Sequence, residues 1–152
     1  HEIVKKHSTS LKTIEKVVAL AILMPIVASM GGIAGMQSLA LVIRSQATNQ
    51  IGESNSRLLI IKESLIGVLN GILWSSIVAV AVYLWFDSVF LGTVIASALM
   101  INLIIGAISG VSLPLILKKM DIDPALAGGV ILTTITDIVG FISLLGVATI
   151  IM

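Results

Sequence analysis

A single carboxylate, Asp137, lies inside the last long apolar segment of this 152-residue sequence and is the side chain best placed to do chemistry. An ionised carboxylate at the centre of a membrane helix costs about 2.5 to 3.5 kcal/mol on insertion scales, unless a cation, a proton or water accompanies it. The four long apolar segments contain no Lys, Arg or His. The group that neutralises Asp137 is therefore a proton, a bound metal ion or a residue outside this chain.

Small and polar residues accompany Asp137 at helical spacing. Gly129, Thr133, Asp137 and Gly140 follow one another at i, i+4, i+8 and i+11, which places them in one stripe along a helix. Such a stripe can line a water-filled path. The alternative is a protonated Asp137 that hydrogen-bonds to Thr133 or Asn102. We favour the functional interpretation, because intramembrane carboxylates are rare and costly.

Further pore-lining candidates are small or polar residues of the other apolar segments. They are Gly31, Gly32, Gly35, Gln37 and Asn102. Gln37 and its neighbour Ser38 could line a cavity or only bond to an adjacent helix, and a hydrogen bond between helices explains Asn102 adequately. Glycines spaced four residues apart favour close helix packing over a pore, and two such pairs occur, Gly67 with Gly71 and Gly106 with Gly110.

The sequence lacks the residues that hydrolysis inside a membrane would need. An intramembrane aspartyl hydrolase uses two carboxylates that share a proton, whereas the predicted spans hold one. A serine hydrolase needs a base beside its nucleophile, yet His1 and His7 both lie in the polar N-terminal tail, where we expect them to be solvated. Cysteine is absent, which excludes thiolate metal sites. We therefore expect a protein that is not an enzyme.

One carboxylate suits a hydrated divalent cation. Mg²⁺ loses its water reluctantly and is usually held by one or two carboxylates while it keeps several waters. A homodimer would supply the second Asp137, because two-fold symmetry brings the same residue of both chains to one axis. Charged rings of this kind select cations. This chemistry does not distinguish Mg²⁺ from Ca²⁺, Mn²⁺ or Co²⁺.

The elements that carry these residues are predicted to be membrane helices. Hydrophobic residues make up 57% of the chain and charged residues 11%, which no soluble domain resembles. Apolar runs occupy about 17–43, 64–86, 89–117 and 126–152, and each can cross the bilayer as a helix. Isolated strands cannot satisfy their backbone groups in lipid, so we predict an all-α membrane bundle of about four spans. A formal net charge of +1 gives no sign of a nucleic-acid partner.

The first apolar run is predicted to be bent or broken. It is longer than one straight crossing needs. Pro25 removes a backbone donor, and Gly31, Gly32 and Gly35 follow within ten residues. We expect the break between Pro25 and Gly35, and a broken helix near the midplane is itself a candidate site.

Polar segments flank and connect the predicted spans. The loop 44–63 and the short connection 118–124 share one face, and a tight turn around Asp87 lies on the other. The first face carries five cations and the tail 1–16 four, so we place the five-cation face in the cytoplasm and both termini outside. The domain division is a polar tail at 1–16 and a membrane pore domain at 17–152. The chain begins at His1, and we expect it to be a piece of a longer protein.

Three stretches resemble the membrane part of MgtE-type magnesium channels. In chain order they are 24–26 with 30–38, 62–71, and 123–125 with 133–141. The first resembles the Pro…Gly-Gly-Asn-x-Gly-x-Gln signature of that family, with Ile33 in place of the Asn. The second resembles the start of the family's next helix and the third its last helix. The resemblance runs in the family's order from about Leu11 to the end.

The resemblance implies a homodimer with five spans per chain that lets Mg²⁺ cross the membrane, the inner membrane in bacteria. Asp137 matches the family's pore carboxylate, and Thr133 and Gly129 match positions along its pore. The family's first span and its cytosolic sensor domains have no counterpart in this sequence. Related carriers exchange ions, so a channel and a cation-coupled exchanger are both open. A non-conducting anchor subunit is a third alternative, but an anchor needs no carboxylate at the depth of Asp137.

Overall fold

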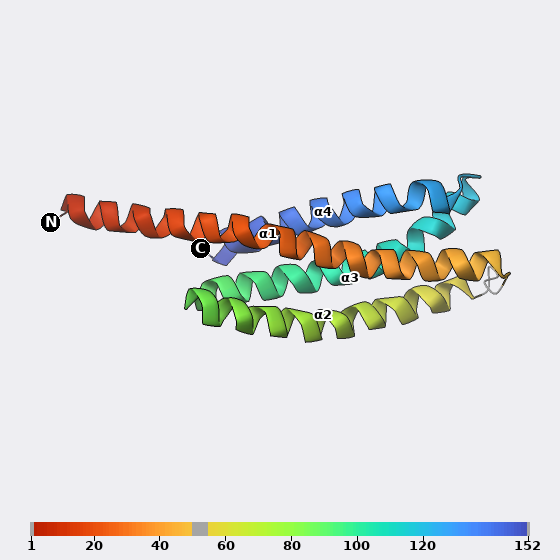
Figure 1. Cartoon of the computed structure of the whole chain (residues 1–152), viewed down its shortest axis with the longest axis horizontal. Helices are drawn as coiled ribbons and strands as arrows, with labels where there is room; N and C mark the ends of the chain where they lie inside the picture. Colours follow the sequence, from red (N-terminus) through yellow and green to blue (C-terminus); the bar gives the residue numbers. More distant parts are fainter. Residues whose placement is uncertain (1, 50–54, 152) are drawn as a thin grey trace.

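Four long α-helices make up the protein (Figure 1). The structure is a computed structural model that describes residues 2–49 and 55–151, with side chains from Leu11 onward. The helices are α1 (Glu2–Ala47), α2 (Ser56–Phe86), α3 (Val89–Lys119) and α4 (Pro124–Ile151). Each is long and apolar enough to cross a membrane. The prediction of an all-α membrane bundle with four spans is confirmed.

The two short connections lie where the sequence placed them. Asp87 adopts a left-handed conformation with φ of 48° after the last residue of α2, and Ser88 then caps α3 by accepting a hydrogen bond from the Leu91 amide. At the opposite end, Asp123 accepts a hydrogen bond from the Ala125 amide. Pro124 is the first residue of α4, a position that does not need its missing N–H. Both turns are short enough to keep successive helices antiparallel.

The predicted break in the first span is wrong, because α1 is one continuous helix through Pro25. The glycines of α1 instead allow it to pack closely against α3. A side chain at Gly31 would collide with Asn102 of α3, and one at Gly35 would place its Cβ 2.9 Å from the Gly106 carbonyl oxygen. The backbones of α1 and α3 therefore touch where a larger residue would hold them apart.

The predicted loop 44–63 is shorter than expected. Helix α1 continues to Ala47 and α2 begins at Ser56, so Lys62 and Glu63 lie within a helix. Residues 50–54 lie outside the described part of the chain. Residues 2–16, predicted as a separate tail, are helical and continuous with α1. Each of the four helices thus extends beyond its predicted apolar run at one end or both.

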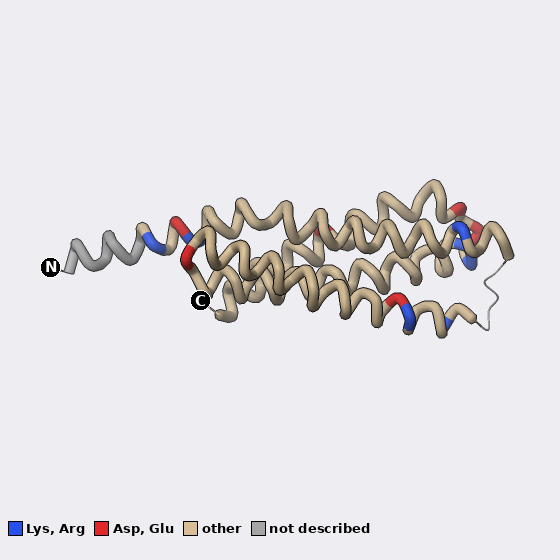
Figure 2. Tube along the Cα trace, turned by 60° about the horizontal axis from the view of Figure 1, so that its bottom comes forward, with Lys and Arg blue, Asp and Glu red and all other residues tan. Residues whose placement is uncertain are grey.

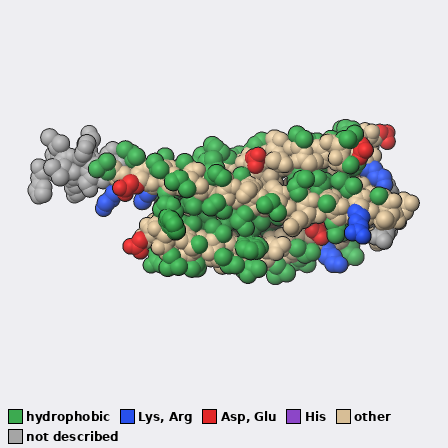
Figure 3. Space-filling view, viewed as in Figure 1, with side chains coloured by type: hydrophobic (Ala, Val, Ile, Leu, Met, Phe, Trp, Pro, Cys, Tyr) green, Lys and Arg blue, Asp and Glu red, His purple; other side chains and the backbone are tan. Residues whose placement is uncertain are grey.

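Helix α3 is the centre of the bundle. It packs against each of the other three helices, and α1 also packs against α4. Half of its most apolar window is buried, compared with between a fifth and a third for the others. The core is aliphatic, with Val27, Ile95, Leu99 and Leu144 among its fully buried members. Hydrophobic side chains are spread over the middle of the face drawn in Figure 3, and Lys and Arg lie toward the two ends of the bundle (Figure 2).

The glycine pairs pack helices together, as their spacing predicted. A Cβ at Gly106 would lie 2.5 Å from the Gly31 carbonyl oxygen, and one at Gly110 would collide with the Gly35 carbonyl. On the other side of α3, a Cβ at Gly67 would lie 2.8 Å from the Ala107 Cβ. These glycines lie inside the bundle, where they set the distance between α3 and its neighbours.

Candidate functional site

Asp137 lies near the middle of α4 and on the outside of the bundle. It is 13 residues after Pro124 and 14 before Ile151, which places it about 20 Å along the helix from either end. Its side chain is exposed. A carboxylate at that depth on an outer surface would face lipid in an isolated bundle, which is the costly placement that membrane proteins avoid.

An open groove of about 510 Å³ surrounds this carboxylate between α1 and α4. Its α4 wall holds Thr133 and Asp137, one turn apart. Its α1 wall is formed mostly by small or polar side chains, together with Ile33 and Met36: Ala28, Ser29, Gly32, Gln37 and Ala40. The groove is therefore an open surface with little side-chain bulk and one carboxyl group.

Asp137 forms no hydrogen bond or ion pair with any other residue in the described part of the chain. The Thr133 hydroxyl donates to the Gly129 carbonyl, at 2.9 Å, and so is used within its own helix. The Asn102 amide donates to the Val27 carbonyl, at 2.7 Å. Neither Thr133 nor Asn102 is hydrogen-bonded to Asp137 in the described structure.

The predicted pore-lining residues divide into two groups. Gly32, Gln37 and Thr133 line the groove with Asp137. Gly129 lies at its margin, half-buried, where an added Cβ would lie 3.6 Å from the Met36 methyl group. The remaining candidates are buried inside the bundle and do not line the groove: Gly31, Gly35, Asn102 and Gly140.

Asn102 is the centre of the inner group. It is fully buried, and a Cβ at Gly140 would lie 2.9 Å from its Nδ2. Gly31 faces the same amide from α1. The two glycines make room for the Asn102 side chain between α1, α3 and α4, so Gly140 does not continue the Asp137 stripe on the outside. A rotation of 100° per residue carries position i+3 partly away from position i, which the stripe estimate did not allow for.

Ile33 borders the groove at the position where the resembling family has Asn. Its side chain is 60% exposed and points to the outside of α1. An apolar residue here leaves Ser29 and Gln37 as the polar side chains of the α1 wall. The polar side chains of the groove are consequently Ser29 and Gln37 on α1 and Thr133 and Asp137 on α4.

A second carboxylate, Glu63, is buried on the opposite side of α1, and sequence reasoning missed it. Its side chain is 8% exposed and accepts a 2.7 Å hydrogen bond from the Ser38 hydroxyl. The two residues line a cavity of about 170 Å³ with Gln37 and Asn70. The available signal was the spacing of Glu63 to Gly67, which puts the carboxylate on the packed face of α2.

Gln37 borders both polar regions of the molecule. It lines the Asp137 groove on one side and the Glu63 cavity on the other. A neighbouring cavity of about 250 Å³, lined by Asn70 and Trp74, also reaches it. The residue is therefore the polar side chain of α1 that adjoins both carboxylate regions.

No three His, Cys, Asp or Glu side chains come together in the part of the chain that the structure describes. Each carboxylate of the spans stands apart from the other in its own cavity or groove. The side chains of His1 and His7 lie outside the described residues.

Comparison with known proteins gives one consistent result. Residues 24–147 match the family described as MgtE, divalent cation transporter. Proteins named magnesium transporter MgtE are similar to the chain, with 39% identity over 136 residues in Bacillus subtilis and 32% over 135 in Thermus thermophilus. These alignments cover 90% and 89% of this chain, and 30% of each relative. The chain thus spans about 30% of the length of these relatives.

Proposed function

The chain belongs to the MgtE divalent cation transporter family, an integral-membrane family of transporters and not of enzymes, and on that premise we propose that it forms the ion path of a Mg²⁺ transporter. Mg²⁺ is then the transported substrate and no resident cofactor. The observation that carries the proposal is Asp137, an exposed and unpaired carboxylate in a groove at the middle of α4. Its cost in lipid is offset when a cation shares the groove.

The groove becomes a path when a second copy of the chain closes it. A single bundle leaves the groove open, and the small side chains along its α1 wall allow another helix surface to approach closely. A two-fold axis beside α4 would bring two Asp137 carboxylates to one point. Closure also removes both carboxylates from lipid, so the same contact explains the placement of the charge and forms the site.

A hydrated Mg²⁺ ion suits the chemistry of this groove. Two carboxylates and a shell of retained waters are a common way to hold Mg²⁺, which dehydrates reluctantly. The amide of Gln37 and the hydroxyl of Ser29 line the same groove and can accept or donate hydrogen bonds to such waters. The ion would be attracted by charge and kept mobile by its water shell.

A cation-coupled exchanger is the second candidate, and Glu63 is the observation that favours it. Transporters that couple ion movement to protons use buried carboxylates at membrane depth. Glu63 is a buried carboxylate about two turns from the start of α2. Its cavity is separate from the groove but adjoins it at Gln37. A non-conducting anchor is the weakest candidate, since it gives neither carboxylate a purpose.

The test is Mg²⁺ uptake by liposomes that contain the full-length natural protein. Asp137→Asn keeps the shape of the side chain and removes its charge, so uptake should fall at least tenfold while the protein still folds. Asp87→Asn is the matched control, because it makes the same chemical change in an exposed turn at the end of the bundle, in a left-handed conformation that Asn tolerates. Normal uptake by a folded Asp137→Asn protein would reject the proposed path.

The two candidate mechanisms separate in the same liposomes. A channel conducts Mg²⁺ down its own gradient, and the membrane potential alone changes the rate. An exchanger needs a counter-ion, so an imposed proton or Na⁺ gradient drives Mg²⁺ uphill. Uphill transport that is lost in Glu63→Gln and kept in Asp87→Asn would identify the exchanger.

A further inference from the structure

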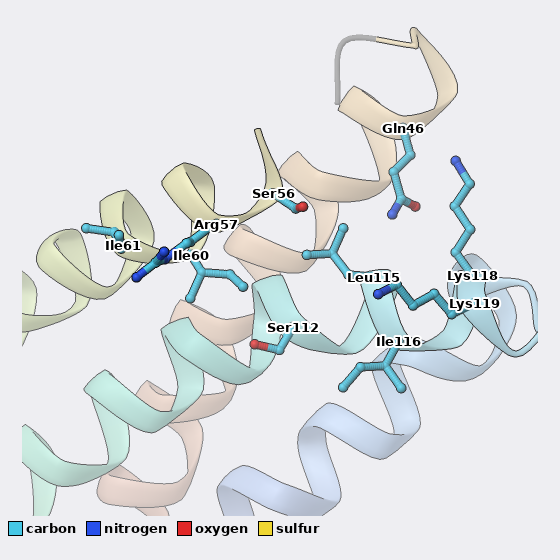
Figure 4. Close-up of a pocket in the computed structure, with 10 residues that line it drawn as sticks. All are labelled: Gln46, Ser56, Arg57, Ile60, Ile61, Ser112, Leu115, Ile116, Lys118 and Lys119. Carbon is cyan, nitrogen blue, oxygen red and sulfur yellow. The ribbon is translucent and has the colours of Figure 1, made fainter. Parts of the chain in front are cut away.

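A basic pocket of about 860 Å³ lies at one end of the bundle, away from the Asp137 groove. Its walls come from the last turn of α1, the first turns of α2 and the last turns of α3 (Figure 4). This is the end where both α1 and α3 finish and where the connections from α1 to α2 and from α3 to α4 lie. In a membrane-spanning bundle, that level is the boundary between hydrocarbon and headgroups.

Three cations surround the pocket. Arg57 comes from α2, and Lys118 and Lys119 come from the final turn of α3. In the described residues none of the three forms an ion pair. The acidic residues that follow the two lysines in sequence, Asp121 and Asp123, lie in the next turn and do not line the pocket. Among the described residues, the lining of the pocket thus carries three positive charges and no carboxylate.

The walls between these cations are aliphatic. Ile60 and Leu115 are half-buried side chains of the wall, and Ile116 is 52% exposed beside them. In Figure 4 the side chain of Lys119 extends from the end of α3 toward Leu115, so that charge and apolar surface meet in one space. A ligand that fills this pocket needs an anionic group and a hydrocarbon part joined together.

We propose that this pocket binds an anionic phospholipid. The phosphate of the headgroup would lie among Arg57, Lys118 and Lys119, and the upper part of an acyl chain would lie against Ile60, Leu115 and Ile116. Basic pockets between membrane helices at the headgroup level are a recognised class of site for acidic lipids. A free phosphate ion would use the cations alone and leave the aliphatic wall in contact with water.

The proposal does not depend on Mg²⁺ transport, because it rests on a pocket at the end of the bundle and not on the groove. It is tested on the full-length natural protein, purified in a neutral detergent and mixed with either phosphatidylglycerol or phosphatidylcholine. Native mass spectrometry counts the lipid molecules that stay bound. Wild-type protein should retain phosphatidylglycerol on the order of 100-fold more strongly than phosphatidylcholine, since each of the three cations contributes on the order of fivefold.

The decisive comparison uses two variants with the same loss of charge. Lys118→Gln with Lys119→Gln removes two cations from the pocket, and Arg44→Gln with Lys62→Gln removes two exposed cations outside it at the same end. A lysine or arginine at a membrane surface contributes on the order of fivefold in anionic-lipid binding. The pocket variant should lose on the order of 25-fold of its phosphatidylglycerol preference, and the control should keep most of it.

Two further arms identify the ligand. Millimolar glycerol 3-phosphate supplies the same anion without acyl chains, so it should displace little phosphatidylglycerol from the pocket. Full displacement would assign the pocket to a soluble phosphate and overturn the lipid proposal. Equal losses in the pocket variant and in the control would reduce the effect to general surface charge, and wild-type protein without a phosphatidylglycerol preference would overturn the proposal directly.

Discussion

Ser38 of α1 donates a 2.7 Å hydrogen bond to Glu63 of α2, across two helices that do not pack closely along their lengths. Both side chains are buried, with exposed fractions of 5% and 8%. Helix α2 packs instead on α3. The bond therefore connects α2 directly to the helix that carries most of the groove, and it gives Glu63 a fixed place beside Gln37.

This bond should be measurable as a coupling free energy. In a double-mutant cycle, Ser38→Ala removes the donor and Glu63→Met removes the acceptor at similar volume. We expect a coupling of about 1 kcal/mol in the free energy of unfolding, within the range of hydrogen bonds between membrane helices. Ser143→Ala is the control, because that buried hydroxyl bonds only to Gly140 of its own helix. Additive effects of Ser38→Ala and Glu63→Met would show that the bond contributes nothing.

A side chain should be destabilising at Gly110 and tolerated at Gly146. A methyl group at Gly110 would collide with the Gly35 carbonyl, while one at Gly146 would have no atom within 4 Å. Gly110→Ala should therefore destabilise the bundle by about 1 to 3 kcal/mol, the usual cost of overpacking, and Gly146→Ala should be neutral or slightly stabilising. Thermal unfolding of the purified proteins measures both. Equal melting temperatures would contradict the close crossing of α1 and α3.

Asn102 should tolerate Ala better than Asp. Its Nδ2 donates to the Val27 carbonyl, and its Oδ1 has no hydrogen-bond partner in the described structure. Asn102→Ala loses one hydrogen bond between helices, worth about 0.6 to 1.7 kcal/mol, in addition to some packing. Asn102→Asp replaces the donor with a carboxylate oxygen beside that carbonyl, so at pH 8 its loss should be several kcal/mol. Unfolding in detergent ranks the two, and a more stable Asp variant would contradict this arrangement.

Ile33→Asn should raise the Mg²⁺ uptake rate. The substitution adds a polar side chain to the wall of the Asp137 groove, where it can hydrogen-bond to the water shell of a passing ion. Ile22→Asn is a matched control on the same helix, since Ile22 is 59% exposed, Ile33 is 60% exposed, and Ile22 does not line the groove. Uptake per folded protein should rise severalfold in the first variant alone. An equal change in both would place the effect outside the groove.

The sequence predicted which segments become helices because that information is local. Apolar runs of the length of a bilayer leave the backbone no other way to satisfy its hydrogen bonds in lipid. Asp87 and Pro124 also act locally, through a left-handed turn and a proline at the first position of a helix. Asp137 was identified for a similar reason, since a carboxylate far from either end of an apolar run is unusual wherever that helix packs.

The prediction of a break after Pro25 was wrong. Glycine loosens an isolated helix, but in a bundle it also lets two helices pack closely. Local rules count a lost hydrogen bond and a flexible backbone. The structure shows α1 continuous through Pro25, with its glycines packed against α3. The α3 residues that these glycines contact are about seventy positions later in the sequence, so a local sequence pattern does not contain them.

Sequence alone thus determined that the protein is a four-span membrane bundle with a carboxylate at mid-depth, because length and composition fix those properties one segment at a time. Only the tertiary structure decided which side of each helix faces inward. It turned Asp137 to the outside with Thr133, turned Gly140 inward to Asn102, and buried Glu63 against Ser38. Those orientations depend on how close two backbones can come, which is a property of pairs of helices and not of any one segment.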